Sequence, residues 1–264
     1  MRIQYASDLH LESWIHSTFE EILDKNAPIL CLLGDICPVP HTHLHAFFEW
    51  CSERWEMVLW VPGNLEIWSS GARGVEAGVS AMRAAVAPFR NVEVLYKDRF
   101  LSEDGVLLLS CPLWNIPRPE MMLQVRGRIW AKADPPPTEK ELLLREYQAN
   151  VAWLNTQLRD THIPTVILTH YAPFPWMQEE EWIQDKDKSI RSIETEKLVR
   201  PPVVAWVFGH CHVVVQEFST WADATGHEFS TLLTSNPRGI PKRPSLEYRK
   251  DAVVRIDPSV YEFF

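Results

Sequence analysis

The chain of 264 residues is 46 % hydrophobic and carries a formal net charge of -9. This length and hydrophobic content are enough for one sizeable core, and we expect a single domain over residues 1–264. The negative charge argues against a protein that binds nucleic acid non-specifically, because phosphate backbones select basic surfaces. A phosphorylated substrate stays open, because bound metal ions would reverse the local field.

Cysteine use and the N-terminus indicate a compartment. The five cysteines are odd in number, form no CxxC pair and often lie in apolar runs, which favours reduced thiols over a disulfide framework. Asp8 lies where a secretory signal would need apolar residues, and no apolar run approaches the roughly 20 residues of a membrane span. We therefore expect a cytoplasmic or nuclear protein that is not secreted and has no membrane partner.

Short apolar runs recur along the chain, and each one ends in polar residues. Their length and β-branched content predict buried strands. These runs span residues 3–6, 29–33, 57–61, 106–110, 165–169, 203–208 and 229–234. Helical patterns occupy residues 19–25, 43–54, 78–86 and 192–199. This alternation predicts an α/β layered fold, and the later strands favour a mixed sheet or two sheets packed face to face.

A longer helix is predicted from residue 138 to about Leu158, since Thr138 and Glu141 form a capping-box pattern. Its expected buried face consists of Leu142, Leu143, Ala149, Ala152 and Trp153. Residues 112–137 and 171–190 are predicted to be long functional loops near the site, with ordinary surface excursions as the alternative. Their tryptophans could stack on a base or pack in the protein, and they are Trp114, Trp130, Trp176 and Trp182. Their arginines could contact phosphates or face solvent, and they are Arg118, Arg126 and Arg128.

Polar side chains follow most of the predicted strands, at the point where each strand ends. They are Asp8 and His10, Asp35, Asn64, His170, and His210 and His212. Functional groups in open α/β folds gather at the carboxyl ends of strands, and these side chains offer the oxygen and nitrogen ligands of divalent cations. Each pattern alone is an ordinary turn or a chance occurrence, whereas the ordered set predicts a metal site. Glycines before Asp35, Asn64 and His210 would let the side chains converge.

The ordered series D-x-H, G-D, G-N-x-E, H and G-H-x-H resembles the signature of the calcineurin-like metallophosphoesterases. The match runs from residue 5 to about residue 212 and extends to the stretch from Thr234 to Pro241. The resemblance implies a four-layer αββα sandwich, with two mixed β-sheets flanked by helices. It also implies two divalent metal ions and the hydrolysis of phosphate monoesters or diesters by a metal-bridging hydroxide.

The family resemblance also assigns roles by position. Asp8, His10 and His212 would hold the first metal, Asn64, His170 and His210 would hold the second, and Asp35 would bridge the two. Asn64 and His170 would also take part in catalysis. Manganese, iron and zinc all remain candidates, because nitrogen and oxygen ligands discriminate weakly among them. The partner would be a phosphate-ester substrate of a class that the sequence leaves open, as it does the oligomeric state.

Leu65 departs from the family pattern, which usually has a histidine here that is assigned to protonating the leaving oxygen. Leucine offers neither a proton nor a hydrogen bond. Three interpretations are open: an enzyme with weakened general acid catalysis, an enzyme with another proton donor, or a catalytically impaired binding or scaffold protein. Candidate donors are Tyr171 and a histidine among His41, His43 and His45, although the trio also suits a solvated helix start. An unrelated metal-dependent hydrolase is disfavoured by the motif order.

Overall fold

The first of two β-sheets contains the N-terminal strands of the chain. The computed structural model describes residues 1–14, 17–71, 74–114, 138–177, 195–222, 225–226 and 228–261. In this sheet, the strand order is β13-β1-β2-β3-β4. Strands β1 (Arg2–Ala6), β2 (Ile29–Leu33), β3 (Met57–Val61) and β4 (Val92–Val94) are parallel, and β13 (Val253–Arg255) is antiparallel to β1. The carboxyl ends of β1, β2 and β3 therefore lie at one edge.

The second sheet is also mixed and has the order β5-β6-β7-β8-β10-β9. Its parallel centre is formed by β6 (Leu107–Ser110), β7 (Thr165–Leu168), β8 (Val203–Phe208) and β10 (Glu228–Ser235). The antiparallel edges are β5 (Asp98–Leu101) and β9 (Val215–Ala222). A small hairpin of β11 (Gly239–Ile240) and β12 (Arg243–Pro244) follows β10.

The two sheets pack face to face. This is seen from their strands, whose alternate residues belong to two different apolar clusters. Cys31 and Leu33 of β2 share an inner cluster with Leu108 and Val166 of the second sheet. The intervening residues, such as Leu32, belong to the outer cluster that includes helical side chains. Both faces of the central strands are thus buried, which explains why the strands read as continuous apolar runs.

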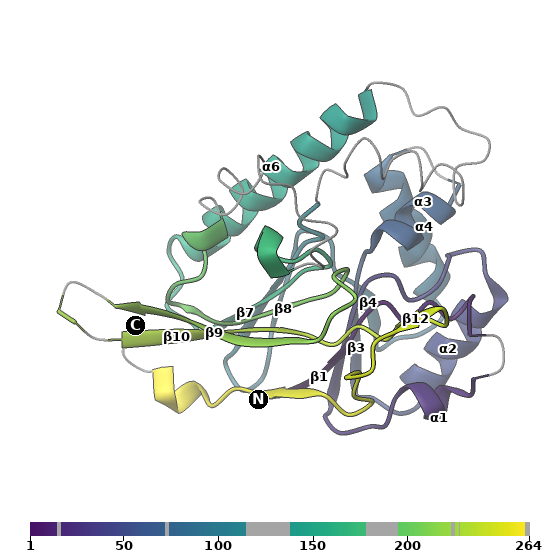
Figure 1. Cartoon of the computed structure of the whole chain (residues 1–264), viewed down its shortest axis with the longest axis horizontal. Helices are drawn as coiled ribbons and strands as arrows, with labels where there is room; N and C mark the ends of the chain where they lie inside the picture. Colours follow the sequence, from purple (N-terminus) through teal and green to yellow (C-terminus); the bar gives the residue numbers. More distant parts are fainter. Residues whose placement is uncertain are drawn as a thin grey trace.

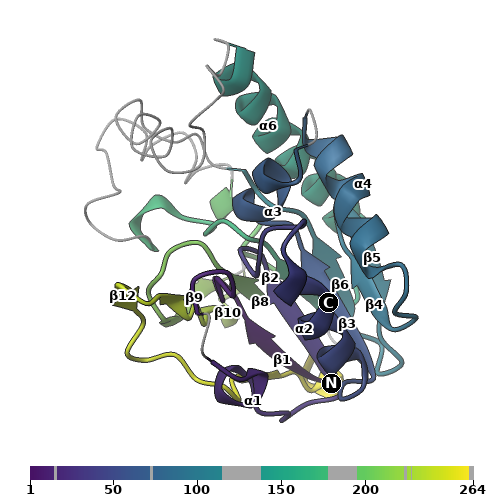
Figure 2. The same ribbon diagram turned by 90° about the vertical axis from the view of Figure 1, so that its right-hand side faces the viewer.

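Helices cover the outer faces of both sheets (Figures 1 and 2). Helices α1 (Phe19–Ile22), α2 (Thr42–Ser52), α3 (Asn64–Ser69) and α4 (Val75–Val86) lie on the side of the first sheet, whereas α6 (Thr138–Leu158) crosses over β7 and β8 (Figure 1). Short 3-10 helices occupy Pro175–Met177 and Pro258–Tyr261. The expected arrangement of helices, sheet, sheet and helix is confirmed.

The buried face of α6 differs in part from the prediction. Leu143 is buried and Trp153 is partly buried, but Ala149 and Ala152 are exposed. The buried positions of the helix are Leu143, Tyr147, Asn150, Val151 and Leu154. These follow the spacing of three and four residues that places side chains on one helical face, and Asn150 belongs to it because its side-chain oxygen accepts a hydrogen bond from the Leu113 N–H at 2.8 Å.

Several predicted features lie wholly or partly outside the described residues. They are the capping-box side chains at 138 and 141, the side chain of Leu142, most of the loops 112–137 and 171–190, and the start of the helix at 192–199. All five cysteines are described and are free and buried, as expected for reduced thiols. Among the described residues, no helix is long and apolar enough to cross a membrane.

Candidate metal centre

The loops that follow β1, β2, β7 and β8 are joined by backbone hydrogen bonds. The Asp8 N–H donates to the Gly34 carbonyl at 2.9 Å, and the His10 N–H donates to the Asp35 carbonyl at 3.1 Å. On the second sheet, the Gly209 N–H donates to the His170 carbonyl at 2.9 Å. The polar residues at these strand ends are therefore held at one place, between the two sheets' carboxyl edges.

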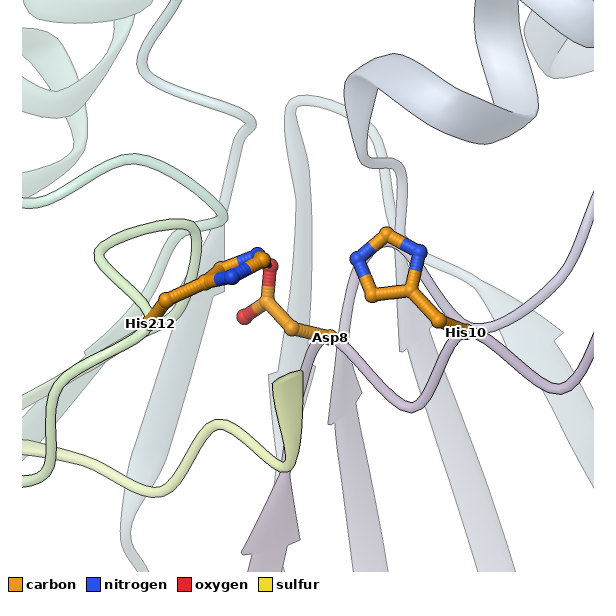
Figure 3. Close-up of side chains that lie close together, drawn as sticks. All are labelled: Asp8, His10 and His212. Carbon is orange, nitrogen blue, oxygen red and sulfur yellow. Dashed lines mark ion pairs between the residues drawn. The ribbon is translucent and has the colours of Figure 1, made fainter. Parts of the chain in front are cut away.

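One group of candidate ligands consists of Asp8, His10 and His212. One ligand atom from each residue lies within 4.8 Å of those of the other two. His212 Nε2 is 3.4 Å from Asp8 Oδ1, and the rings of His10 and His212 are 5.4 Å apart. Figure 3 shows the two imidazoles approaching from opposite sides, with the Asp8 carboxylate between them. One carboxylate and two imidazoles form a donor set that suits a divalent cation.

A second group consists of Asp35, His170 and His210, again with ligand atoms within 4.8 Å of one another. His170 Nε2 is 3.6 Å from Asp35 Oδ1. Asn64 joins this group, because its side-chain oxygen is 3.0 Å from His170 Nε2 and its amide donates to Asp35 Oδ2 at 3.2 Å. All seven residues expected from the sequence are thus distributed over two neighbouring groups.

The backbone is left-handed at five of these seven residues. The φ angle is 50° at Asp8, 48° at His10, 54° at Asp35, 64° at His210 and 53° at His212. Non-glycine residues rarely adopt this region, and each occurrence costs on the order of 1–3 kcal/mol. Such conformations persist when the surrounding structure enforces them, and they cluster at functional sites. Here they turn successive side chains toward common points directly after a strand.

Glycines permit the close approach of these loops. A Cβ atom at Gly34, where φ is 80°, would lie 2.4 Å from His170 Nδ1. A Cβ atom at Gly63 would lie 2.3 Å from Asp35 Oδ1, and one at Gly209 would lie 2.6 Å from the Ser7 Cβ. All three distances are shorter than van der Waals contact. The predicted role of the glycines before Asp35, Asn64 and His210 is therefore borne out by the packing.

Glu66 organises the loop that carries Asp35. Its carboxylate is fully buried and accepts backbone N–H groups from Asp35 at 3.0 Å, Ile36 at 2.6 Å, Cys37 at 3.3 Å and Gly63 at 2.9 Å. Burial, with the nearby charge of Asp35, raises the pKa of Glu66 to about 8, while these N–H donors act in the opposite direction. Asp35 itself accepts from the Leu65 N–H at 2.7 Å. One residue of the G-N-x-E pattern thus supports the G-D pattern.

The electrostatics of the centre combine burial with close charges. Burial opposes ionisation of Asp8, yet the hydrogen bond and charge of His212, with the charges of His170 and His10, lower its pKa. Burial also disfavours the charged form of His10, but Glu12, Asp35 and Asp8 raise its pKa to about 9.

Two further groups of the centre stay neutral. Burial and the neighbouring His170 lower the pKa of His210 well below its ordinary value. The hydroxyl of Tyr171 has a pKa raised well above its ordinary value by burial and by Asp35 and Asp8. A neutral imidazole can donate its lone pair to a cation, and a neutral phenol can donate a hydrogen bond.

Buried polar atoms in the first group fit a cation. His10 Nε2 is buried and has no hydrogen-bond partner among the described residues, and the buried Asp8 Oδ1 faces His212 Nε2 at 3.4 Å. Buried polar atoms usually find a partner, so such an exception needs an explanation. An ionised carboxylate oxygen offers a lone pair, an imidazole nitrogen offers one once a cation displaces its proton, and one divalent cation would satisfy both. The donor chemistry of both groups therefore fits two metal ions.

Leu65 occupies the first turn of α3 and is largely buried, with 9 % of its surface exposed. Of the candidate proton donors, Tyr171 directly contacts two candidate ligands. Its hydroxyl donates to Asn64 Oδ1 at 3.2 Å, and its ring lies 4.2 Å from that of His210.

The histidine trio has local contacts at the start of α2. His41 caps α2 by accepting from the His43 N–H at 3.2 Å, and His45 packs on Phe89 with ring centroids 5.1 Å apart. These contacts match the helix-start interpretation of the trio.

Two of the tryptophans singled out in the sequence can be placed. Trp114 is fully buried and therefore packs in the core, whereas Trp176 is 50 % exposed and stacks on Phe174 at 4.5 Å. Trp130, Trp182 and the three loop arginines lie outside the described residues.

Sequence reasoning missed Glu12, whose carboxylate is 3.2 Å from His10 Nδ1. Its position two residues after His10 was the available signal.

Comparisons with known proteins give distant likenesses. No family model matches the chain. The uncharacterized protein L509 of Acanthamoeba polyphaga mimivirus is 24 % identical over 239 residues, which cover 80 % of this chain and 85 % of that protein. Among solved structures, a dimetal phosphatase from Danio rerio aligns with 13 % identity and a TM-score of 0.46, covering 89 % of this chain and 86 % of its own.

A second solved structure, TT1561 of Thermus thermophilus, aligns with 12 % identity and a TM-score of 0.44, covering 90 % of this chain and 89 % of its own. Identities and TM-scores this low do not assign an activity.

Proposed function

We propose that this chain is a calcineurin-like metallophosphoesterase that depends on two divalent metal ions. The observation that carries the proposal is the pair of three-residue ligand groups, Asp8, His10 and His212 beside Asp35, His170 and His210. A chance cluster of polar residues would not be expected to combine buried ligands, left-handed backbone conformations and glycines whose neighbours leave no room for a Cβ atom. The order of the groups along the chain is the order of the family signature.

In this proposal, Asp8, His10 and His212 would hold one ion, and Asn64, His170 and His210 would hold the other. Asp35 would serve both groups, since its Oδ1 is 3.6 Å from His170 Nε2 and its charge also acts on His10. Bound divalent ions supply Lewis acidity toward phosphate oxygens and acidify water. The chain supplies the fixed positions of the ligands, and Glu66 keeps the Asp35 loop in place through its backbone contacts.

Proton delivery to the leaving oxygen is the weak point of this centre, because Leu65 offers no donor. General acid catalysis is typically worth about 10²–10⁴-fold, so its loss slows poor leaving groups far more than activated ones. Tyr171 is the described side chain best placed to substitute, because its neutral hydroxyl lies 3.2 Å from Asn64 Oδ1. We therefore infer an enzyme with attenuated general acid catalysis.

The test is hydrolysis of an aryl phosphomonoester and an aryl phosphodiester by the parent chain and by Leu65→His. Each assay is run after chelation and after addition of Mn²⁺ or Zn²⁺. Metal-dependent turnover by the parent supports the proposal. Turnover by the variant alone would mean that the centre is assembled and lacks only its proton donor. Absence of turnover in both would overturn the enzymatic proposal.

A second candidate is a catalytically impaired protein that uses the metal centre as a fixed receptor for a phosphorylated partner. The specific observation in its favour is the apolar, largely buried Leu65 at the family's proton-donor position. The two candidates separate in the same assay. A chain that binds two metal ions and turns over no ester, before or after Leu65→His, is the receptor.

A further inference from the structure

The two metal groups orient their imidazoles by different partners. In the first group, His10 Nδ1 lies 3.2 Å from Glu12 Oε1. A carboxylate can only accept a hydrogen bond, so Nδ1 carries the hydrogen. The other ring nitrogen, Nε2, is buried and has no hydrogen-bond partner among the described residues. Figure 3 shows one nitrogen of the His10 ring facing Asp8 and His212 and the other facing away.

In the second group, the corresponding partner is a neutral backbone oxygen. His170 Nδ1 lies 2.7 Å from the carbonyl of Leu33, the last residue of β2. This contact leaves His170 Nε2 toward Asn64 and Asp35. Both histidines thus present the same ring nitrogen to their group, one held by a full negative charge and the other by a dipole.

We propose that Glu12 is a positioning residue for the first metal ion, holding His10 Nε2 toward Asp8 and His212 and raising the affinity of this group alone. The inference rests on the proposed metal centre. A carboxylate behind a ligating histidine fixes the tautomer, fixes the ring orientation and increases the basicity of the ligating nitrogen. Loss of such a partner typically costs about 10–100-fold in metal affinity.

Glu12 is placed for this role by its surroundings as well as by its distance. Its side chain is 22 % exposed, so the ion pair is only partly screened by solvent. Its Oε1 also accepts from the Ser13 hydroxyl at 3.2 Å, while its Oε2 is buried without a partner among the described residues. Of these two partners of Oε1, only the imidazole of His10 belongs to the candidate metal group.

The experiment measures the binding of Mn²⁺ to the metal-free full chain, in competition with a chromophoric chelator. Two binding steps are expected in the parent. His212→Ala and His210→Ala each remove one step and so assign the steps to the two groups. Glu12→Gln preserves the shape and an acceptor oxygen but removes the charge. Glu12→Ala removes the acceptor oxygens together with the charge. Glu49→Gln, an exposed position on α2, is the matched control for the same chemical change.

Glu12→Gln is expected to weaken the step of the first group by about 10–100-fold and to leave the other step unchanged. Glu12→Ala should weaken the same step at least as much, and Glu49→Gln should change neither. Unchanged binding in both Glu12 variants would overturn the inference. An equal loss at both steps would overturn it too, because that result indicates a general structural role.

The outcome is separable from that of the proposed function. If the parent binds two ions but neither it nor Leu65→His hydrolyses an ester, the enzymatic proposal is refuted and the role of Glu12 is decided by binding alone. A parent that hydrolyses esters, with Glu12 variants of normal affinity, refutes only the role of Glu12. A parent that binds no Mn²⁺ refutes both.

Discussion

Replacing Glu66 by glutamine tests how the Asp35 loop is held. In the parent, Glu66 Oε2 accepts from the Asp35 and Gly63 N–H groups, and Oε1 accepts from the Ile36 and Cys37 N–H groups. Glutamine keeps one acceptor oxygen and places an NH₂ group against the other two donors. Two buried N–H groups then lose their acceptor, at about 1–3 kcal/mol each, which gives a total of about 2–6 kcal/mol.

This loss is a large fraction of the roughly 5–15 kcal/mol that stabilises an ordinary domain. At about 2–4 °C per kcal/mol, the melting temperature of Glu66→Gln should fall by at least about 4 °C. Thermal unfolding followed by circular dichroism on the metal-free chain measures this difference. Glu49→Gln, which makes the same substitution at an exposed position, should stay within about 0.5 kcal/mol of the parent. A melting temperature of Glu66→Gln equal to that of the parent would refute the reasoning.

Further predictions concern the metal centre. Asp35→Asn should reduce the metal content below two ions per chain and abolish metal-dependent turnover. If the variant kept both ions and full turnover, Asp35 would not serve both groups. Gly34→Ala should destabilise the fold and weaken the second group, because its Cβ would lie 2.4 Å from His170 Nδ1, and an unchanged melt would refute this packing. If Tyr171 donates to the leaving oxygen, Tyr171→Phe should slow alkyl esters more than aryl esters, and equal slowing would argue for a purely structural hydroxyl beside Asn64. Mn²⁺ at about 100 times its dissociation constant should stabilise the chain by about 2.7 kcal/mol in thermal melts, and chelator should reverse the shift.

The strands and the candidate ligands were readable from the sequence because both are local signals. Residues 29–33, 57–61 and 203–208 are apolar throughout, as strands buried on both faces must be, and their structural bounds agree with the prediction. Polar residues directly after such strands lie at the carboxyl edge by construction. The position of Asp8 and Asp35 at the carboxyl edge of one sheet, and of His210 at that of the other, therefore needed no knowledge of the tertiary contacts.

The short and edge strands were not predicted. β4, β5, β9 and β13 are absent from the sequence-based assignment because their residues are partly exposed and lack a continuous apolar run. β13 pairs with β1 across almost the whole length of the chain, so its conformation depends on a partner that no local window contains. The buried face of α6 was misassigned at Ala149 and Ala152 for a similar reason, since the contacts of the helix decide which side is covered.

By itself, the sequence determined the identity and order of the seven candidate ligands, because strand ends and ligand types are encoded locally. The family resemblance had already divided these residues into two groups, and only the tertiary structure decided what holds each of them in place. Glu12 behind His10, Glu66 beneath Asp35 and the Leu33 carbonyl behind His170 act through hydrogen bonds whose geometry the fold decides. Such contacts depend on distances and directions of a few ångströms, which are set by the packing of the two sheets and not by any single stretch of the chain.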